Sequence, residues 1–453
     1  MNILIIGGGK FGSTLVDCLI KEGHDIALID TNYKLVENLV AKYDILGICG
    51  NGANVETLKE AGVAKARVLI AATHSDEVNV LCALIGKKLG AHHTVARIRA
   101  PEYSKQLLFM RQELGISMAV NPEMETAAEI SRVLRSMHTV KIESFCRGRA
   151  DLVELRLTEE SPFVGLRLWE LYKKFKLKIL ICAVKRGDEI HIPDGNFVLE
   201  AGDSIHITAS HGDLSEMFGI LGYAKQRVRS VLIVGGGTIA YYLGSELCEN
   251  GIRVKIVEID EKRCVELSEK LPKATIINGN GTDETLLVEE GIDNFDACVA
   301  LTGIDEENII ISLCAKYRKI PYIISKVNNS SLLRVINDDR MSAIAPKTIS
   351  ANHVVRYVRS KQGDVSGSVQ TLYKMVDSRV EAVEFIVGEG AACVRTPLRE
   401  LKLKPGILIA CIVRGGKVII PGGDDTIEVN DNIVVVSSDL YLRNLDEIMD
   451  VKS

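Results

Sequence analysis

Several features that would mark a membrane-spanning, secreted or nucleic-acid-binding protein are missing from this sequence of 453 residues. No stretch approaches the roughly 18 to 20 apolar residues that cross a bilayer, and the longest apolar runs, such as Ile179 to Val184, have the length of a strand. The N-terminus has neither a basic region nor a cleavage site, so it does not resemble a signal peptide. With a formal net charge of -5, the chain lacks the positive electrostatic potential that attracts the phosphates of DNA or RNA. We therefore expect a cytoplasmic protein with no nucleic-acid partner.

The cysteines also lack a recognisable pattern. There are 11 of them, an odd number, and no C-x-x-C pair occurs. This arrangement fits neither a zinc ribbon nor the disulfide framework of a secreted domain. We expect most of the cysteines to be small core residues, and we predict no metal site.

An internal repeat is the most informative feature that is present. Gly7-Gly8-Gly9 recurs as Gly235-Gly236-Gly237, and Asp76 to Asn79 recurs as Asp305 to Asn308. Similar matches continue to the end of each half, so the chain is a tandem duplication. Each half contains the same two modules in the same order.

The first module of each half alternates short apolar segments with helical patterns. Segments that are apolar throughout are typical of strands buried on both faces, and helices between them favour a parallel sheet. In the first half the predicted strands are 2–6, 25–30, 45–49, 68–73 and 95–99, with helices at 11–21, 34–41, 55–61 and 76–89.

The second module has a different pattern, because Leu152 to Leu157 and Ser204 to Thr208 alternate as half-exposed antiparallel strands do. We therefore predict an α/β protein with two Rossmann-type, doubly wound parallel sheets, each followed by a small α+β domain. In the first half we expect a Rossmann domain at 1–121, a crossover helix at 122–140 and a small domain at 141–224. In the second half we expect a Rossmann domain at 228–345, a crossover helix with linker at 346–368 and a small domain at 369–453.

A glycine fingerprint lies between the first strand and the first helix. It reads Gly7-Gly8-Gly9-Lys10-Phe11-Gly12, a G-x-G-x-x-G that allows a tight turn and close approach of the backbone to a pyrophosphate. Asp30 ends the next strand, where its carboxylate can accept both hydroxyls of a ribose and repels a 2'-phosphate. The pattern favours NAD(H); the alternative is a Rossmann domain with an empty crevice.

Three further residues stand at the strand ends where ligands of such sheets bind. Thr73 and His74 follow the fourth strand and are candidates for nucleotide contact, although His74 is equally consistent with a solvated loop residue. Arg97 places a charge in an apolar strand, so it requires an anion. This anion is either a nucleotide phosphate or the carboxylate of Asp76 or Glu77, and the sequence leaves both possibilities open.

The second fingerprint is an altered copy. It reads Gly235-Gly236-Gly237-Thr238-Ile239-Ala240, with Glu258 in the place of Asp30 and Lys326 in the place of Arg97. The second crevice therefore retains a carboxylate and a cation, but their side chains differ in length from those of the first. Two possibilities remain open: it binds a nucleotide, either the one bound at the first site or another, or it binds none.

Hydride transfer requires an acid or base beside the nicotinamide, and no such group presents itself. The histidines of the second module, His191 and His206, correspond to Ile419 and Val434 in the other half. We therefore predict no catalytic residue and no enzymatic activity. An NAD-dependent oxidoreductase is the competing class.

The two fingerprints, the duplicated order of modules, A-R-I-R-x-P-E-Y at Ala96 to Tyr103 and I-V-R-G at Ile412 to Gly415 resemble the TrkA family. This family comprises cytoplasmic regulatory subunits of bacterial Trk-type potassium uptake, built from tandem RCK (KTN) domains. The resemblance implies nucleotide contacts, NAD(H) in some members and ATP or ADP in others, at Gly7 to Phe11, Asp30, Thr73, His74 and Arg97, with a second set at Gly235 to Ile239 and Glu258.

The resemblance further implies a peripheral protein that forms a homo-oligomer, a dimer or a tetrameric ring, on the cytoplasmic face of a potassium-translocating membrane subunit. A nucleotide sensor for another membrane transporter remains an alternative. The segment after Pro122 has an apolar stripe that either pairs with another crossover helix or packs on its own sheet; the stripe comprises Met124, Ala127, Ala128, Ile130, Val133, Leu134 and Met137. Because we find no basic amphipathic helix, we expect no direct lipid insertion, with attachment through the transporter.

Overall fold

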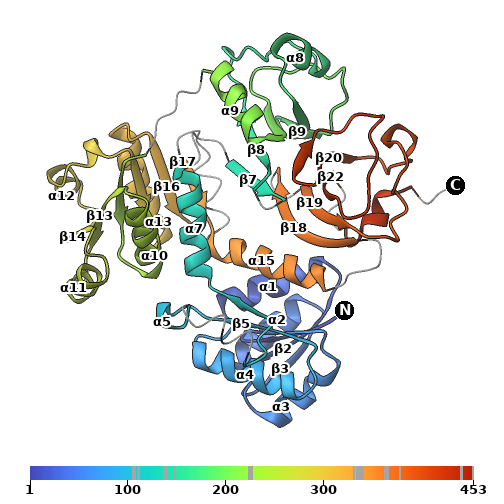
Figure 1. The fold of residues 1–453 in the computed structure, drawn as a ribbon. Helices are drawn as coiled ribbons and strands as arrows, with labels where there is room; N and C mark the ends of the chain where they lie inside the picture. The colour runs from blue at the N-terminus through green and yellow to red at the C-terminus, as the bar shows by residue number, and fades with distance from the viewer. Residues whose placement is uncertain are drawn as a thin grey trace. The chain divides into compact units, whose positions relative to one another are not determined.

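The chain folds into two units, each of which contains one part of each half (Figure 1). The first unit comprises Met1–Arg135 and Arg227–Val355, and the second comprises Ser136–Gln226 and Arg356–Ser453. The computed structural model describes residues 1–104, 109, 113–135, 141–146, 148–222, 228–329, 332, 341–361, 367–376, 379–438 and 442–450. Within these ranges, none of the helices combines the length and the apolar character needed to span a bilayer.

The first half supplies a six-stranded parallel sheet with the order β3-β2-β1-β4-β5-β6. Its strands are β1 (Asn2–Ile6), β2 (Asp25–Asp30), β3 (Leu46–Cys49), β4 (Val68–Ala71), β5 (His93–Arg97) and β6 (Met118–Val120). Its helices are α1 (Lys10–Lys21), α2 (Tyr33–Lys42), α3 (Val55–Glu60), η1 (Val63–Lys65), α4 (Asp76–Lys88) and α5 (Pro101–Ser104). The order reverses between β1 and β4, which is the switch point of a doubly wound sheet.

The second half repeats this sheet with the order β14-β13-β12-β15-β16-β17. Its strands are β12 (Ser230–Val234), β13 (Arg253–Glu258), β14 (Thr275–Asn278), β15 (Ala297–Ala300), β16 (Tyr322–Lys326) and β17 (Met341–Ile344). Its helices are α10 (Thr238–Glu249), α11 (Glu261–Lys270), α12 (Glu284–Glu289), η2 (Ile292–Asn294) and α13 (Asp305–Tyr317). Val231 to Val234 are at most 1% exposed, because both faces of this strand are covered.

The second unit contains two five-stranded antiparallel sheets. The first comprises β7 (Lys141–Phe145), β8 (Ala150–Arg156), β9 (Ile179–Arg186), β10 (Glu189–His191) and β11 (Ser204–Ser210), with helices α8 (Leu168–Phe175) and α9 (His211–Ile220). The second comprises β18 (Gly367–Met375), β19 (Val380–Val387), β20 (Ile407–Arg414), β21 (Lys417–Ile419) and β22 (Asn432–Ser437), with η3 (Leu398–Glu400) and η4 (Leu445–Ile448). The predicted fold class is confirmed, although β18 begins inside the stretch expected to be linker.

The prediction that β8 and β11 are half exposed was wrong. Ile205 and Ile207 pack in the core of the first small domain, whereas residues on the opposite face, such as Leu152, join an apolar cluster that also contains Val434 and Val436 of the second small domain. His206 and Thr208 alternate with the isoleucines and are only 1% and 2% exposed. The alternation therefore separates two buried faces, one of which tolerates polar side chains.

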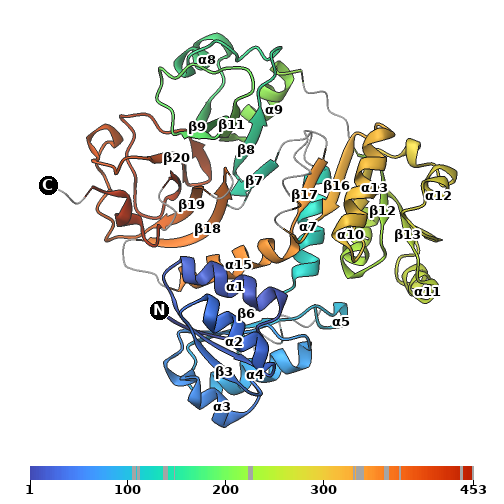
Figure 2. The same cartoon turned by 180° about the vertical axis from the view of Figure 1, so that it is seen from behind.

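The crossover helices α7 (Pro122–Arg135) and α15 (Pro346–Ser360) connect the modules. Ala127, Ile130 and Leu134 of α7 are buried against α10 of the other half, and Ser131 donates to Glu246 at 2.7 Å. Figures 1 and 2 show α15 running beside α1, so each crossover helix lies on a Rossmann domain of the other half. The two helices also meet, since Ser350 Oγ donates to Glu125 Oε2 at 2.5 Å. Most of the stripe is thus covered within the chain, but Ala128 is exposed and Met137 lies outside the described residues.

A buried ion pair anchors the end of α15 in the second unit. Arg359 and Glu381 are joined by two hydrogen bonds, of 2.9 and 3.1 Å, and both side chains are 0% exposed. We predict that Arg359→Met lowers the free energy of unfolding of this unit by about 3 to 5 kcal/mol, because Glu381 is left as a buried, unpaired charge. Urea unfolding should show that Arg359→Met with Glu381→Leu restores most of the loss. Equal stability of the single and double variants would contradict this account.

Candidate functional site

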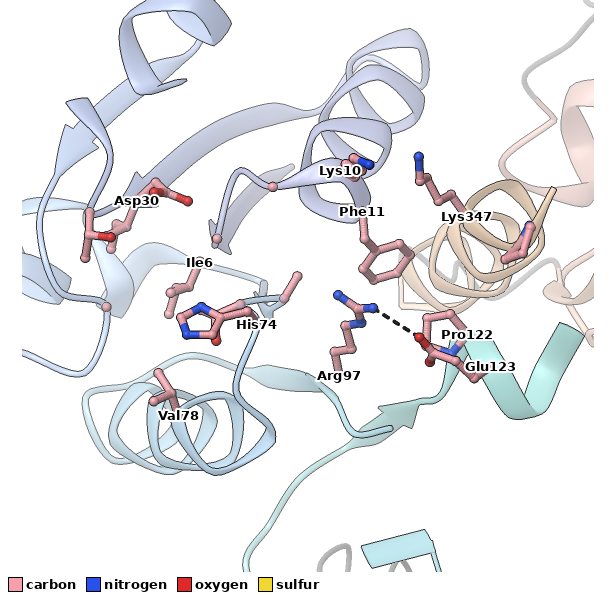
Figure 3. A pocket seen from close by; sticks show the side chains of 18 of the residues that line it. Ile6, Lys10, Phe11, Asp30, His74, Val78, Arg97, Pro122, Glu123 and Lys347 are labelled. Carbon is pink, nitrogen blue, oxygen red and sulfur yellow. Dashed lines mark hydrogen bonds and ion pairs between the residues drawn. The ribbon is translucent and has the colours of Figure 1, made fainter. Parts of the chain in front are cut away.

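A cavity of about 620 Å³ opens at the carboxyl ends of the first parallel sheet, at its switch point (Figure 3). Most of the residues predicted for the first nucleotide site line it: Gly7, Gly9, Lys10, Phe11, Asp30, Thr73, His74 and Arg97. Gly8 and Gly12 belong to the same turn but are buried behind its surface. His74 has an exposed side chain and also lines the cavity, so both interpretations of this residue remain open.

The glycines of the first fingerprint have different structural roles. Gly7 has a φ of 98°, and a Cβ there would lie 2.8 Å from the Thr73 nitrogen. A Cβ on Gly12 would lie 1.8 Å from the Gly7 oxygen, so both positions are needed to close the turn. A Cβ on Gly9, in contrast, meets nothing within 4 Å because it points into open space. Gly9 is therefore the glycine that leaves room for a ligand.

Helix α1 begins beside this open space with its backbone N–H groups free for an anion. Its N-cap is Gly9, no side chain caps the first turn, and the first turn holds no acidic residue. Asp30 is held next to it, since Oδ2 accepts from Gly8 N at 2.7 Å and Oδ1 accepts from Asn32 N at 2.8 Å. The positive end of the helix fits a pyrophosphate, and the oriented carboxylate retains lone pairs for ribose hydroxyls.

Arg97 lies at the other end of the cavity. Its guanidinium makes an ion pair of 3.4 Å with Glu123 at the start of α7 and lies 5.5 Å from the centroid of the Phe11 ring. Arg97 forms an ion pair with neither of its expected partners, Asp76 and Glu77. Asp76 instead accepts from Arg99 N at 2.7 Å. Among the described residues, Arg97 Nε is buried without a hydrogen-bond partner. Burial lowers the pKa of Arg97, so its charge is incompletely compensated.

The second half also contributes cations to this cavity, which the sequence analysis did not foresee. Lys326 at the end of β16 and Lys347 in the first turn of α15 line it, together with Ile239, Asn328 and Pro346. Burial lowers the pKa of Lys326, and burial together with nearby Lys10 lowers the pKa of Lys347. Figure 3 shows Lys347 reaching from α15 toward Lys10 and Phe11. The cations outnumber the carboxylates of Asp30 and Glu123, so the cavity fits a polyanion such as a nucleotide phosphate chain.

A buried asparagine that the sequence analysis passed over positions this end of the site. Asn79 Oδ1 accepts from Thr73 N at 2.7 Å, and Asn79 Nδ2 donates to Arg97 O at 2.9 Å. Asn308 makes the equivalent bonds to Thr302 N and Lys326 O, of 2.8 and 2.9 Å. Recurrence of the same asparagine in both halves was the signal that could have identified this role.

The second fingerprint repeats the positive φ of its first glycine but has different side chains. Gly235 has a φ of 100°, and Glu258 Oε2 accepts from Gly236 N at 2.5 Å. Arg263 Nε donates to Gly236 O at 2.8 Å. Gly237, like Gly9, faces open space, and Thr238 begins α10. Ile239 and Lys326, which were assigned to this second site, line the first cavity.

The described residues contain no cluster that could hold a metal ion. Most of the cysteines are buried as expected, among them Cys82, Cys182, Cys298 and Cys411. Burial raises the pKa of Cys82 to about 11 and that of Cys298 to about 12, which disfavours the reactive thiolate. The buried cysteines thus behave as core residues, whereas Cys49 is exposed.

Comparison with known families agrees with the duplicated architecture. The family model for the TrkA-N domain matches residues 3–122 and 231–350, and that for the TrkA-C domain matches residues 152–222 and 382–449. The chain belongs to the TrkA family. The family resemblance noted from the motifs is therefore confirmed over most of the sequence.

Relatives named Trk system potassium uptake protein TrkA align over their full length. The homologue from Archaeoglobus fulgidus is 32% identical over 99% of this chain and 100% of its own. The protein from Haemophilus influenzae is 31% identical, with coverage of 99% and 98%. Among solved structures, the GsuK RCK domain is 16% identical with a TM-score of 0.62 and covers 97% of this chain and 92% of that chain. The GsuK channel bound to NAD is 17% identical with a TM-score of 0.61, covering 99% and 78%.

We predict that Gly9→Val abolishes nucleotide binding at the first cavity without loss of folding. The φ of Gly9, -58°, is open to valine, and the added side chain enters only the space that a pyrophosphate would occupy. Gly237→Val is the matched variant of the second half. Titration calorimetry with NADH, ATP and ADP on both variants counts the sites and assigns them. Unchanged affinity and stoichiometry in Gly9→Val would contradict the assignment.

Proposed function

We propose that this chain is a nucleotide-sensing regulatory subunit of a potassium uptake system, and that it acts on a Trk-type potassium-translocating membrane subunit. The full-length similarity to relatives named Trk system potassium uptake protein TrkA supports the potassium uptake system. The glycine turn, the helix N-terminus and Asp30 support NAD(H) as the ligand of the first cavity. The proposed domain limits and site residues are those expected from the sequence, with the lining lysines of the second half added.

The observation that carries this proposal is the composition of one cavity from both halves. Lys10 and Arg97 approach it from the first half, and Lys326 and Lys347 approach it from the second. A phosphate chain bound among these cations favours the arrangement that holds them together. A ligand shifts a conformational equilibrium only through such a difference in affinity, so this cavity can report nucleotide occupancy as a change in the arrangement of the halves.

The charge of the cavity also bears on the choice of nucleotide. ATP carries more negative charge than NAD(H), and its terminal phosphates suit the excess of cations better. We therefore propose that ATP or ADP competes with NAD(H) for the first cavity. The second fingerprint, with Glu258 and Arg263 around Gly236, is proposed to bind a nucleotide with a different preference.

Regulation rather than catalysis is the role we propose. His191 and His206, the histidines weighed as catalysts, are residues of strands β10 and β11 in the other unit. An oxidoreductase needs a proton donor or acceptor at the nicotinamide, and His74 is the single histidine among the predicted site residues.

Self-association is part of the proposal, and α13 offers a surface for it. Ile310, Leu313 and Tyr317 are 57%, 51% and 80% exposed and follow one another along one face of the helix, with Ile304 50% exposed before its first turn. A contiguous apolar face of this kind is typical of a protein contact. We propose that it lies between copies of this chain in a dimer or ring, on the inner face of the membrane.

We predict that Lys326→Ala with Lys347→Ala weakens ATP binding about 10- to 100-fold and NADH binding less, because each substitution removes a charge-assisted contact to phosphate. Calorimetry measures both affinities on the same preparation. The control is Lys270→Ala, an exposed lysine at the end of α11. Equal affinity of the double variant and the unaltered chain for ATP would refute the shared cavity.

Affinity purification of the tagged chain from membranes of its own source tests the function itself. The expected result is recovery of a potassium-translocating membrane subunit, in an amount that changes when ATP or NADH is added. Recovery of an unrelated transporter would instead support a nucleotide sensor for that protein. Steady, protein-dependent loss of the NADH absorbance band with a panel of carbonyl substrates would establish the oxidoreductase alternative.

A further inference from the structure

Helix α8 of the first small domain exposes large aromatic side chains that the fold does not require. Trp169, the only tryptophan of the chain, is 48% exposed, and Tyr172, one turn later, is 60% exposed. The opposite face of the helix is already packed, with Leu171 2% exposed and Phe175 5.5 Å from Phe163 between ring centroids. The aromatic face therefore does not contribute to the core of its own domain.

Lysines follow these aromatic residues along the chain, in the last turn of α8 and just after it. Lys173, Lys174, Lys176 and Lys178 are all exposed, and Lys173 Nζ lies 6.0 Å from the centroid of the Trp169 ring. The acidic residue of the helix, Glu170, turns back to accept from Arg167 N at 2.8 Å, which caps the first turn. We refer to Trp169, Tyr172 and these four exposed lysines together as the α8 face.

The second small domain lacks this surface. Between its corresponding strands, β19 and β20, it has the short helix η3, whose sequence is Leu-Arg-Glu. Both small domains form the same five-stranded sheet, so the fold is made without an α8 face. The feature belongs to the first half alone.

We propose that the α8 face docks on an anionic lipid surface. Trp and Tyr rings favour the level of the headgroups, where one edge contacts the acyl boundary and the other remains hydrated. Each lysine close to a negatively charged membrane adds favourable electrostatic energy. A protein partner fits less well, because protein interfaces are depleted in lysine. This proposal departs from the expectation of no direct lipid insertion, which rested on the absence of a basic amphipathic helix.

Because Trp169 is the only tryptophan, the fluorescence of the unmodified full-length chain reports on the α8 face directly. Vesicles of phosphatidylcholine with phosphatidylglycerol should shift its emission to shorter wavelength and carry the chain upward in flotation. Vesicles of phosphatidylcholine alone should do neither, and high salt should reverse the effect because it screens the lysines. No emission shift and no flotation with the anionic vesicles would overturn the proposal.

The substitutions Lys173→Glu and Lys174→Glu together should weaken vesicle binding at least about tenfold. The matched control, Lys402→Glu with Lys417→Glu, makes the same change in net charge at exposed positions of the second small domain and should retain binding. Equal loss in both variants would assign the binding to overall charge and overturn the role of α8.

The proposal does not depend on the nucleotide site, so the two are tested separately. NADH binding of every variant is measured in parallel, and unchanged binding shows that the nucleotide site is intact. A chain that ignores vesicles but shows a Trp169 emission shift with an isolated membrane subunit would assign the α8 face to an acidic protein surface, which rejects lipid as the occupant while leaving the proposed function intact.

Discussion

The apolar seam between α7 and α10 is the contact on which the first cavity depends. Ala127, Ile130 and Leu134 are at most 3% exposed because they pack on a helix of the other half. This packing fixes the start of α7, with Pro122 and Glu123, at the edge of the cavity, and α15 brings Pro346 and Lys347 to the same edge. The hydrophobic effect thus determines which charges meet the ligand, although the seam itself contains none of the lining cations.

The two halves differ in charge where they face each other across this cavity. Arg97 is paired with Glu123, whereas the corresponding residues of the second half are Lys326 and Lys347, two cations. The turns differ as well. A Cβ at Gly12 would collide with the Gly7 oxygen at 1.8 Å. The second half nevertheless has Ala240 at the corresponding position, where it is 0% exposed. The helix of the second fingerprint must therefore stand farther from its glycine turn, so the two crevices are not equivalent.

Local sequence patterns predicted the helices and strands but not the contacts between segments that are distant along the chain. The parallel sheets, the glycine turn and the position of Asp30 followed from apolar runs and from motif spacing, because these depend on neighbours along the chain. The lining by Lys326 and Lys347 could not be predicted, because it arises from the exchange of crossover helices between distant segments. The full burial of His206, which was expected to be a partly buried strand residue, was not predicted for the same reason, since a second sheet covers that face of β11. Helix α8 escaped notice because it is short and follows a loop.

The exchange of crossover helices makes this single chain a covalently tethered pair of subunits. A symmetric dimer of two identical half-length chains would place the same residue at the start of both crossover helices, and the cavity edge would then carry two carboxylates or two ammonium groups. Joining the halves removes that symmetry, so Glu123 and Lys347 occupy equivalent places with opposite charge. Gene fusion therefore gives the cavity a built-in charge asymmetry, and a mutation on one side need not be repeated on the other.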